Sequence, residues 1–266
     1  SDMLNLKEYA DTPKLLADYL PWACLVAPGV VLNKDGSFQT TFRYRGPDLE
    51  SSTEEELVSV MARVNNVLRR FGSGWALFFE AQRNEVHDYP EAEFPDALSW
   101  LIDQERALQA EESGARFESA YYLTLLWLPP ADATGRAEKA LIQRAETEDA
   151  ATWRHRLETF QQQTDRVFDL LSTCLAEIAK LSDDETLIYL HSTISTKRHP
   201  VVTPELPVFL DAVLADEPFA GGLEPMIGEA HLRTLTILGF PASTLPGILD
   251  ELNRQGFAYR WATRFI

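Results

Sequence analysis

Apolar and polar residues alternate along several stretches of the chain, which is the pattern of β-strands. Residues 30–32 and 38–44 flank the turn sequence 33–36, whose Asp35-Gly36 pair suits a turn with positive φ. These residues therefore predict a hairpin with one buried and one solvated face. Residues 75–81 predict another strand. Residues 118–128 are apolar on both faces, which indicates a central strand of a sheet.

Other segments place their apolar residues at helical spacing. Thr53 and Glu56 form a capping box that opens a helix reaching Phe71. Further helices are predicted over residues 96–112 and 204–214, and one opens at the Ser182/Glu185 capping pair.

The longest helical pattern covers residues 148–181. Its apolar residues alternate by four and three, from Trp153 to Leu181, as in a heptad seam. Two interpretations remain open. The helix either lies across a sheet of its own chain or forms a seam for self-association or a partner.

The last stretch predicts a β-α-β unit. Residues 231–238 alternate as a strand that ends before Pro241, and Ser243 or Thr244 caps a short helix that ends near Gly256. A second strand follows over residues 257–265. We therefore predict an α+β fold with a mixed, mostly antiparallel sheet fed from both ends of the chain, helices packed on it and a helical middle segment.

The pattern favours one domain over residues 1–266. Within it we distinguish an α/β sub-region (1–130), a mainly helical one (131–220) and the closing unit (221–266).

Composition narrows the classes of function. The chain has 266 residues, 45% of them hydrophobic, and a formal net charge of −17. This charge disfavours nonspecific binding to DNA or to anionic membranes. Cys24 and Cys174 lie far apart, which is typical of a reducing cytosolic compartment. We find no signal peptide, and no apolar run approaches the length that spans a bilayer.

Catalytic motifs are missing from the sequence. It contains no G-x-x-x-x-G-K-[ST], no G-x-S-x-G and no H-E-x-x-H, and Leu77 replaces the last glycine of a G-x-G-x-x-G begun at Gly72. We therefore predict no catalytic, cofactor-binding or metal-binding residues in this chain. Among the histidines, His191 lies on an apolar helix face and is interpreted as a core residue with its hydrogen bonds satisfied.

Four residues are candidate partner contacts. Leu20 and Trp22 belong to the segment Leu20-Pro21-Trp22, which leads into an apolar connector over residues 22–28. Exposed apolar segments near prolines often dock onto other chains. Lys197 and Arg198 lie in a basic loop that ends at Pro200. The alternative interpretation of Arg198, and of Arg116, is a solvated charge rather than a phosphate contact.

Five segments carry a resemblance to a known family: Asp18-Tyr19-Leu20-Pro21-Trp22, VAPGVVLNKDGSFQTTFRYRGPDL (26–49), FGSGWALFFEAQR (71–83), YLHSTIS with HPV (189–201) and GGLEPMIGEAHLRTLTILGFP (221–241). They resemble the CagE/TrbE/VirB family, the N-terminal region of the large ATPases of type IV secretion systems, and most closely its TrbE-type conjugal transfer members.

The resemblance implies a cytoplasmic protein, peripheral at the bacterial inner membrane. It implies ATP and Mg²⁺ for the full-length protein, bound by a RecA-like motor domain downstream of this region and absent from this chain. The region itself is expected to be a noncatalytic docking and assembly domain. It would contact inner-membrane subunits and other copies of the motor, which is expected to form a hexamer, and would not bind nucleic acid directly.

Two other classes of function remain open. A free-standing adaptor or dimerisation protein would use the heptad-like seam. A small-molecule enzyme would need an acid–base group, for which Glu80, interpreted as lying at a strand end, and Asp88 are the candidates. Both carboxylates also fit solvated surface charges.

Overall fold

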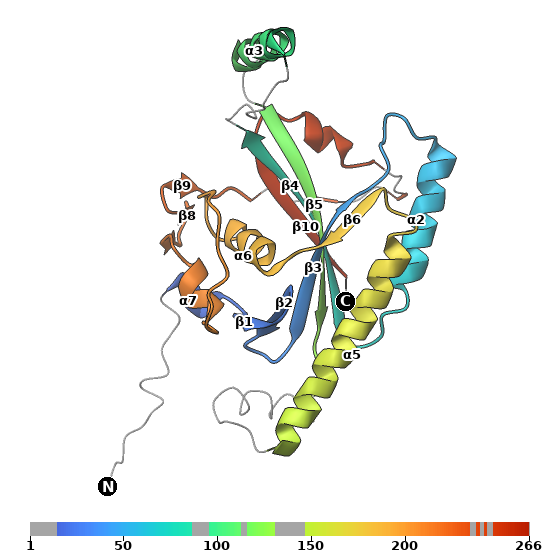
Figure 1. The fold of residues 1–266 in the computed structure, drawn as a ribbon, viewed down its shortest axis with the longest axis vertical. Helices are drawn as coiled ribbons and strands as arrows, with labels where there is room; N and C mark the ends of the chain where they lie inside the picture. Colours follow the sequence, from blue (N-terminus) through green and yellow to red (C-terminus); the bar gives the residue numbers. More distant parts are fainter. Residues whose placement is uncertain are drawn as a thin grey trace.

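A computed structural model of the chain describes residues 15–86, 96–112, 116–130, 147–234, 238–239, 242–243 and 247–265. It has an α+β fold around one seven-stranded sheet (Figure 1). All strand pairs described in this sheet are antiparallel. The prediction of an α+β class with a mostly antiparallel sheet is confirmed.

The strands follow an order that differs from their order in the sequence. Across the sheet they are β1 (Trp22–Ala27), β2 (Val30–Asn33), β3 (Phe38–Arg45), β5 (Arg116–Trp127), β4 (Trp75–Val86) and β10 (Tyr259–Phe265). The short strand β6 (Glu177–Lys180) pairs with the second half of β3, alongside β2. Because β10 pairs with β4, the sheet takes strands from both ends of the chain, as predicted.

The hairpin between β2 and β3 forms, and its turn is as the sequence predicts. The prediction of one solvated face is wrong in part, because Gln39 and Thr41 on that face are 6% and 2% exposed. Gly36 has a φ of 85°, a conformation that favours glycine, and its N–H donates to the Asn33 carbonyl. The register then pairs Phe42 with Leu123, and Leu123 with Phe79. Alternation therefore gives the sheet one strongly aromatic and aliphatic face and one face that carries more polar side chains.

The aromatic face is covered by α2 (Glu54–Leu68) and α5 (Thr147–Leu171), which lie on one side of the sheet (Figure 1). Phe160 of α5 is fully buried there. Its ring lies 5.7 Å from that of Phe38 and stacks at 5.6 Å on Trp75. These contacts make α5 the main cover of the larger hydrophobic core.

The opposite face packs against α1 (Leu16–Tyr19), α6 (Asp183–Ser192) and α7 (Leu210–Leu214), which form a second hydrophobic core. Helix α3 (Ala97–Glu112) instead projects beyond the ends of β4 and β5 (Figure 1). Its Leu98, Trp100 and Leu101 side chains are mostly exposed. The strands β7 (Phe219–Ala220), β8 (Met226–Ile227) and β9 (Ala230–His231) form a small separate sheet.

Three predicted elements are wrong in part. The segment predicted as an apolar connector over residues 22–28 forms strand β1, which pairs with β2. The helix predicted over residues 148–181 ends at Leu171, and β6 follows it. Ser172 and Thr173 donate their hydroxyls to carbonyls of the last helical turn, and the Ala176 N–H bonds to Arg45. The backbone is thereby directed into the sheet.

The helix predicted over residues 204–214 is shorter than expected. It covers Leu210–Leu214 and begins after Pro207.

The heptad-like seam is satisfied within the chain. Phe160, Thr164 and Val167 are buried against the sheet. The interpretation of a helix lying across its own sheet is therefore confirmed, and the motivation for a dimer seam is lost.

The closing β-α-β unit is also wrong in part. Strand β9 ends at His231, and Leu232 to Thr234 are not in a strand. Residues 235–237 and 244–246 lie outside the described part of the chain. Gly247 has a φ of 82°, which an α-helix excludes, and a short 3₁₀ helix, η3 (Asp250–Arg254), replaces the predicted helix. The final strand, β10, is confirmed.

Candidate partner-binding groove

An apolar cavity of about 640 Å³ lies between α2 and the sheet. The apolar residues of α2 recur at helical spacing, but Val67 is the buried residue of this helix. Helix α5 contacts β3 in the middle of the sheet and packs beside α2, and α2 borders the cavity together with the outer strands β4 and β10. The inward face of α2 is therefore only partly covered by its own chain.

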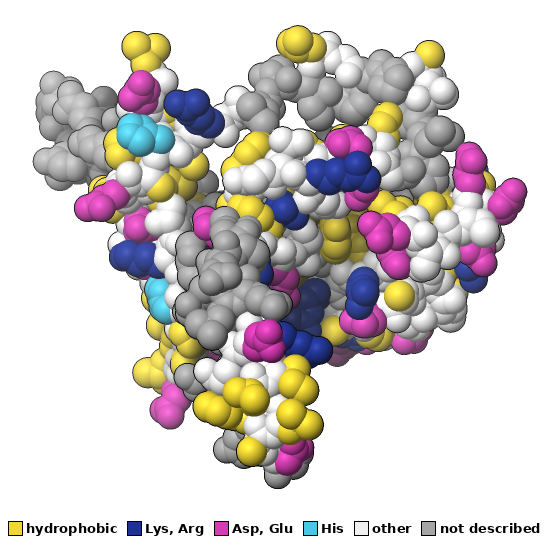
Figure 2. All heavy atoms as spheres, turned by 90° about the horizontal axis from the view of Figure 1, so that it is seen from above, with side chains coloured by type: hydrophobic (Ala, Val, Ile, Leu, Met, Phe, Trp, Pro, Cys, Tyr) yellow, Lys and Arg dark blue, Asp and Glu magenta, His cyan; other side chains and the backbone are white. Residues whose placement is uncertain are grey.

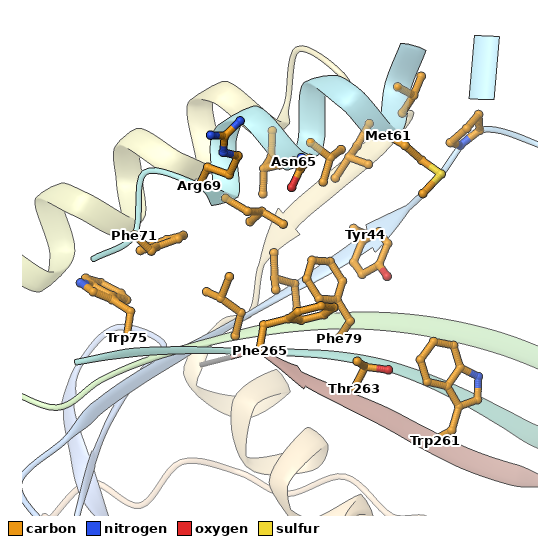
Figure 3. A pocket seen from close by; sticks show the side chains of 18 of the residues that line it. Tyr44, Met61, Asn65, Arg69, Phe71, Trp75, Phe79, Trp261, Thr263 and Phe265 are labelled. Carbon is orange, nitrogen blue, oxygen red and sulfur yellow. The ribbon is translucent and has the colours of Figure 1, made fainter. Parts of the chain in front are cut away.

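The groove is lined mainly by aromatic and aliphatic side chains from α2, β3, β4 and β10 (Figure 3). Its lining includes Tyr44, Val60, Met61, Val64, Leu68, Phe71, Trp75, Leu77, Phe79, Trp261 and Phe265, with Asn65, Arg69 and Thr263 as polar members. Cavities of this size and composition are typical of sites that take an apolar ligand or an anchoring side chain of a partner.

Phe79 lies at the centre of the aromatic lining. Its ring meets that of Tyr44 at 6.2 Å and that of Phe265 at 5.8 Å, both edge to face. Met61 and Phe265 are 53% and 52% exposed. Large apolar side chains that remain this accessible beside a cavity are typical of a protein contact surface.

Strand β10 gives the groove a second feature. It is the last strand in the sheet order, so it has one described neighbour, β4. Its Trp261, Thr263 and Phe265 side chains line the groove. The groove therefore borders a sheet edge, where a partner can add backbone hydrogen bonds to side-chain contacts.

Acidic side chains lie next to the end of the groove that Pro47 lines. Asp48 and Glu50 precede α2, and Glu54, Glu55 and Glu56 form its first turn; all five are exposed. Hydrogen bonds from Ser51 and from the Glu50 N–H lower the pKa of Asp48. This end of the groove is therefore negatively charged near neutral pH, and it favours cationic partners.

The structure places the four candidate contacts elsewhere. Leu20 and Trp22 are each 6% exposed and belong to the second core, so the premise that they are exposed is wrong. Lys197 and Arg198 follow α6 on the face opposite the groove. Lys197 Nζ lies 3.4 Å from Asp216, and Arg198 donates to Asn84 and to the Ser195 carbonyl. Burial and the nearby charge of Arg260 lower the pKa of Arg198.

Glu80 is neither at a strand end nor solvated. It lies within β4, is 6% exposed and faces α6. Arg260 forms an ion pair with it at 2.5 Å, and the Tyr189 hydroxyl and the Gln82 amide donate to it at 3.0 Å and 2.7 Å. Its two oxygens are thus engaged in a structural network that ties β10 and α6 to β4. Asp88, the other acid–base candidate, lies outside the described residues.

Tyr44 in the groove wall makes the free energy of unfolding depend on pH in the alkaline range. Burial, with a smaller effect of Tyr121, raises its pKa from 10.0 to about 12. The unfolded chain therefore loses this proton first. The stabilising contribution is complete below about pH 10 and is lost as pH rises toward 12. In urea unfolding at pH 8, 10 and 11, Tyr44→Phe should lose stability less steeply than the wild type. Parallel pH profiles would contradict this assignment.

The described residues contain no helix with the length and apolarity that a bilayer span requires. On the face drawn in Figure 2, lysine and arginine side chains lie among the acidic ones.

Comparisons with known proteins give the class of this domain. Residues 29–135 match the family described as "Type IV secretion system ATPase VirB4/TrbE, N-terminal domain". The chain is 32% identical to the conjugal transfer protein TrbE of Rhizobium radiobacter over 99% of its own length and 34% of that protein. It thus spans about a third of that relative.

Two further relatives fix the particular family. In Sinorhizobium fredii a probable conjugal transfer protein TrbE is divided between two chains; the present chain is 36% identical to the first of them, over 54% of this chain and 99% of that protein. It is 27% identical to the type IV secretion system protein virB4 of Brucella suis, over 50% of this chain and 16% of that protein. The chain belongs to the VirB4/TrbE family of type IV secretion ATPases, within the N-terminal region of those proteins.

No sequence motif predicted the groove. Its lining comes from segments far apart in the chain, and the spacing within α2 reads as ordinary core packing. Met61 and Phe265 come from α2 and β10 and meet at the groove only in the tertiary structure.

Proposed function

We propose that this chain is a docking and assembly region of a conjugation ATPase, and that the groove between α2 and β10 holds a segment of a partner. The observation that carries this proposal is an open apolar groove with half-exposed Met61 and Phe265. Membership of the VirB4/TrbE family supports a role within a type IV secretion apparatus.

The groove's occupant is an apolar and basic segment at the cytoplasmic end of an inner-membrane subunit. Cytoplasmic flanks of membrane helices are rich in Lys and Arg, which complements the carboxylates beside Pro47 and the net charge of −17. A second copy of this chain would bring the same negative charge to the groove. Contacts between motor subunits, with a hexamer as the expected state, then use other surfaces of the full-length protein.

The remaining functions of the whole protein follow the same proposal. The chain spans 34% of the Rhizobium radiobacter protein, and we propose that ATP and Mg²⁺ bind in a part of the full-length protein that this sequence does not include; we derive no step through them. The region acts at the inner membrane through its protein partner and does not bind DNA itself.

Cross-linking in donor cells tests the occupant. A photoreactive amino acid is placed at Met61, which lines the groove, or at Val58, which is half exposed on the same helix and does not line it. We expect position 61 of the full-length protein to cross-link to an inner-membrane subunit of the same apparatus, and position 58 to do so weakly. A cross-link from 61 to a second copy of the chain, or equal yields at both positions, would overturn the proposal.

The matched substitutions are Met61→Glu and Val58→Glu. A buried methionine contributes about 1.5 to 3 kcal/mol, so Met61→Glu should weaken partner binding by about ten- to a hundredfold. Val58→Glu should change it little. Both residues are already about half exposed, so the fold should survive in each variant. Binding to the cross-linked subunit is measured by isothermal titration calorimetry, and conjugation frequency serves as the second readout.

A further inference from the structure

The side chains of His191, His199 and Asp216 lie together at the C-terminal end of α6. His191 closes the last turn of α6, His199 lies in the loop that follows, and Asp216 comes just after α7. One ligand atom from each lies within 4.8 Å of the others. The two imidazole rings are 4.6 Å apart between centroids.

His191 supplies the observation that points to a ligand. The residue is 3% exposed, and its Nε2 atom is buried without a hydrogen-bond partner. That atom lies 3.1 Å from Asp216 Oδ1, but the pair lacks hydrogen-bond geometry. The sequence predicts a core histidine with its hydrogen bonds satisfied; the burial is confirmed, and the satisfaction is wrong for Nε2. In a neutral imidazole with its proton on Nδ1, Nε2 and the carboxylate oxygen would face each other as two acceptors, and a metal ion between them would satisfy both.

The surrounding contacts hold the three residues in place. Glu217, the neighbour of Asp216, accepts hydrogen bonds from the Ser195 hydroxyl at 2.8 Å and from the Thr196 N–H at 2.7 Å. These bonds tie the segment after α7 to the end of α6. Lys197 lies 3.4 Å from the other carboxylate oxygen, Oδ2, so Oδ1 stays directed at His191.

We propose that His191 Nε2, His199 and Asp216 Oδ1 bind a divalent transition metal of the zinc class. Two imidazoles and one carboxylate are a ligand set of protein zinc sites, which leave a fourth position to water. Zn–N and Zn–O bonds of about 2.0 to 2.2 Å place neighbouring tetrahedral ligands about 3.3 Å apart, close to the separation of His191 and Asp216. His199 is exposed on its loop and closes the set by a small movement. The ion would link α6, the loop after it and the α7–β7 connection.

Titration of the chelator-treated 266-residue protein with Zn²⁺, and with Co²⁺ as a spectroscopic probe, tests the site. We expect one ion per chain, tetrahedral Co²⁺ absorption bands and a higher Tm. His199→Ala and Asp216→Asn change exposed residues, so these variants should fold. Loss of a residue that only hydrogen-bonds to a metal ligand weakens metal binding by about 10- to 100-fold. Each of these variants removes a ligand itself, so each should weaken Zn²⁺ binding by more than that.

His231→Ala is the matched control, because His231 is also exposed and lies 4.0 Å from a carboxylate, that of Glu224. It should leave Zn²⁺ affinity unchanged. NMR detection of the imidazole nitrogens should show shifts at His191 and His199 on zinc addition. The proposal fails if no stoichiometric ion binds, if His199→Ala binds as the wild type does, or if His231→Ala removes the binding.

Discussion

Replacing Arg260 with methionine is expected to lower the free energy of unfolding by about 3 kcal/mol. The substitution removes the cation that pairs with Glu80 at 2.5 Å, and leaves a buried carboxylate with the Tyr189 and Gln82 donors alone. Breaking a buried ion pair from one side costs about 3 to 5 kcal/mol, and the partial exposure of Arg260 favours the lower end. Urea unfolding followed by circular dichroism measures the change.

The double variant Glu80→Met/Arg260→Met separates charge from packing. Because it removes both partners, it should recover most of the lost stability. Arg264→Met is the control on the same strand; Arg264 is exposed and stacks over Phe78, so its loss should cost less than about 0.5 kcal/mol. Equal losses in Arg260→Met and the double variant would show that the ion pair is not the cause.

Phe160→Ala is expected to cost about 3 to 5 kcal/mol. Phe160 is fully buried and packs between Phe38 and Trp75, so alanine would leave a cavity in the larger core. The same change should also loosen α5 on the sheet, and tryptophan fluorescence in urea would report both the stability and the altered environment of Trp75.

Leu98→Ala provides the comparison for an exposed position. Leu98 of α3 is 66% exposed, and its truncation should change the stability by less than about 0.5 kcal/mol. Similar losses in the two variants would mean that α5 does not form the core described above.

Local pattern was sufficient where chemistry within a few residues decides the structure. The turn at Gly36, the capping boxes at Thr53 and Ser182, the alternation along β3 and the apolar run of β5 are such cases. Local pattern was not sufficient where pairing with a distant segment of the chain decides the secondary structure. Residues 177–180 continue a helical pattern, but they form β6 because the edge of β3 offers backbone partners there.

Neither the groove nor the cluster of His191, His199 and Asp216 could be located without the tertiary structure. Trp22 looked like an exposed anchor because its sequence neighbours are prolines and apolar residues, but α6 and α7 cover it. Met61 belongs to the helical pattern that follows Thr53, and nothing in that pattern marks it as the residue that lies at an open groove. His191, His199 and Asp216 meet through a helix end and two loops, so no fixed spacing marks them.

The pairing of β10 with β4 also sets an order of events during synthesis. Strand β4 leaves the ribosome long before its outer neighbour β10, because β5, β6 and all the elements up to η3 are made between them. During that interval the β4 edge lacks the β10 backbone, and Glu80 lacks the guanidinium of Arg260. Sheets that depend on such distant strand pairs fold slowly, and their unpaired strand edges are exposed until folding is complete. The nascent chain therefore carries an aggregation-prone edge until β10 emerges, and this is a period in which a chaperone would protect it.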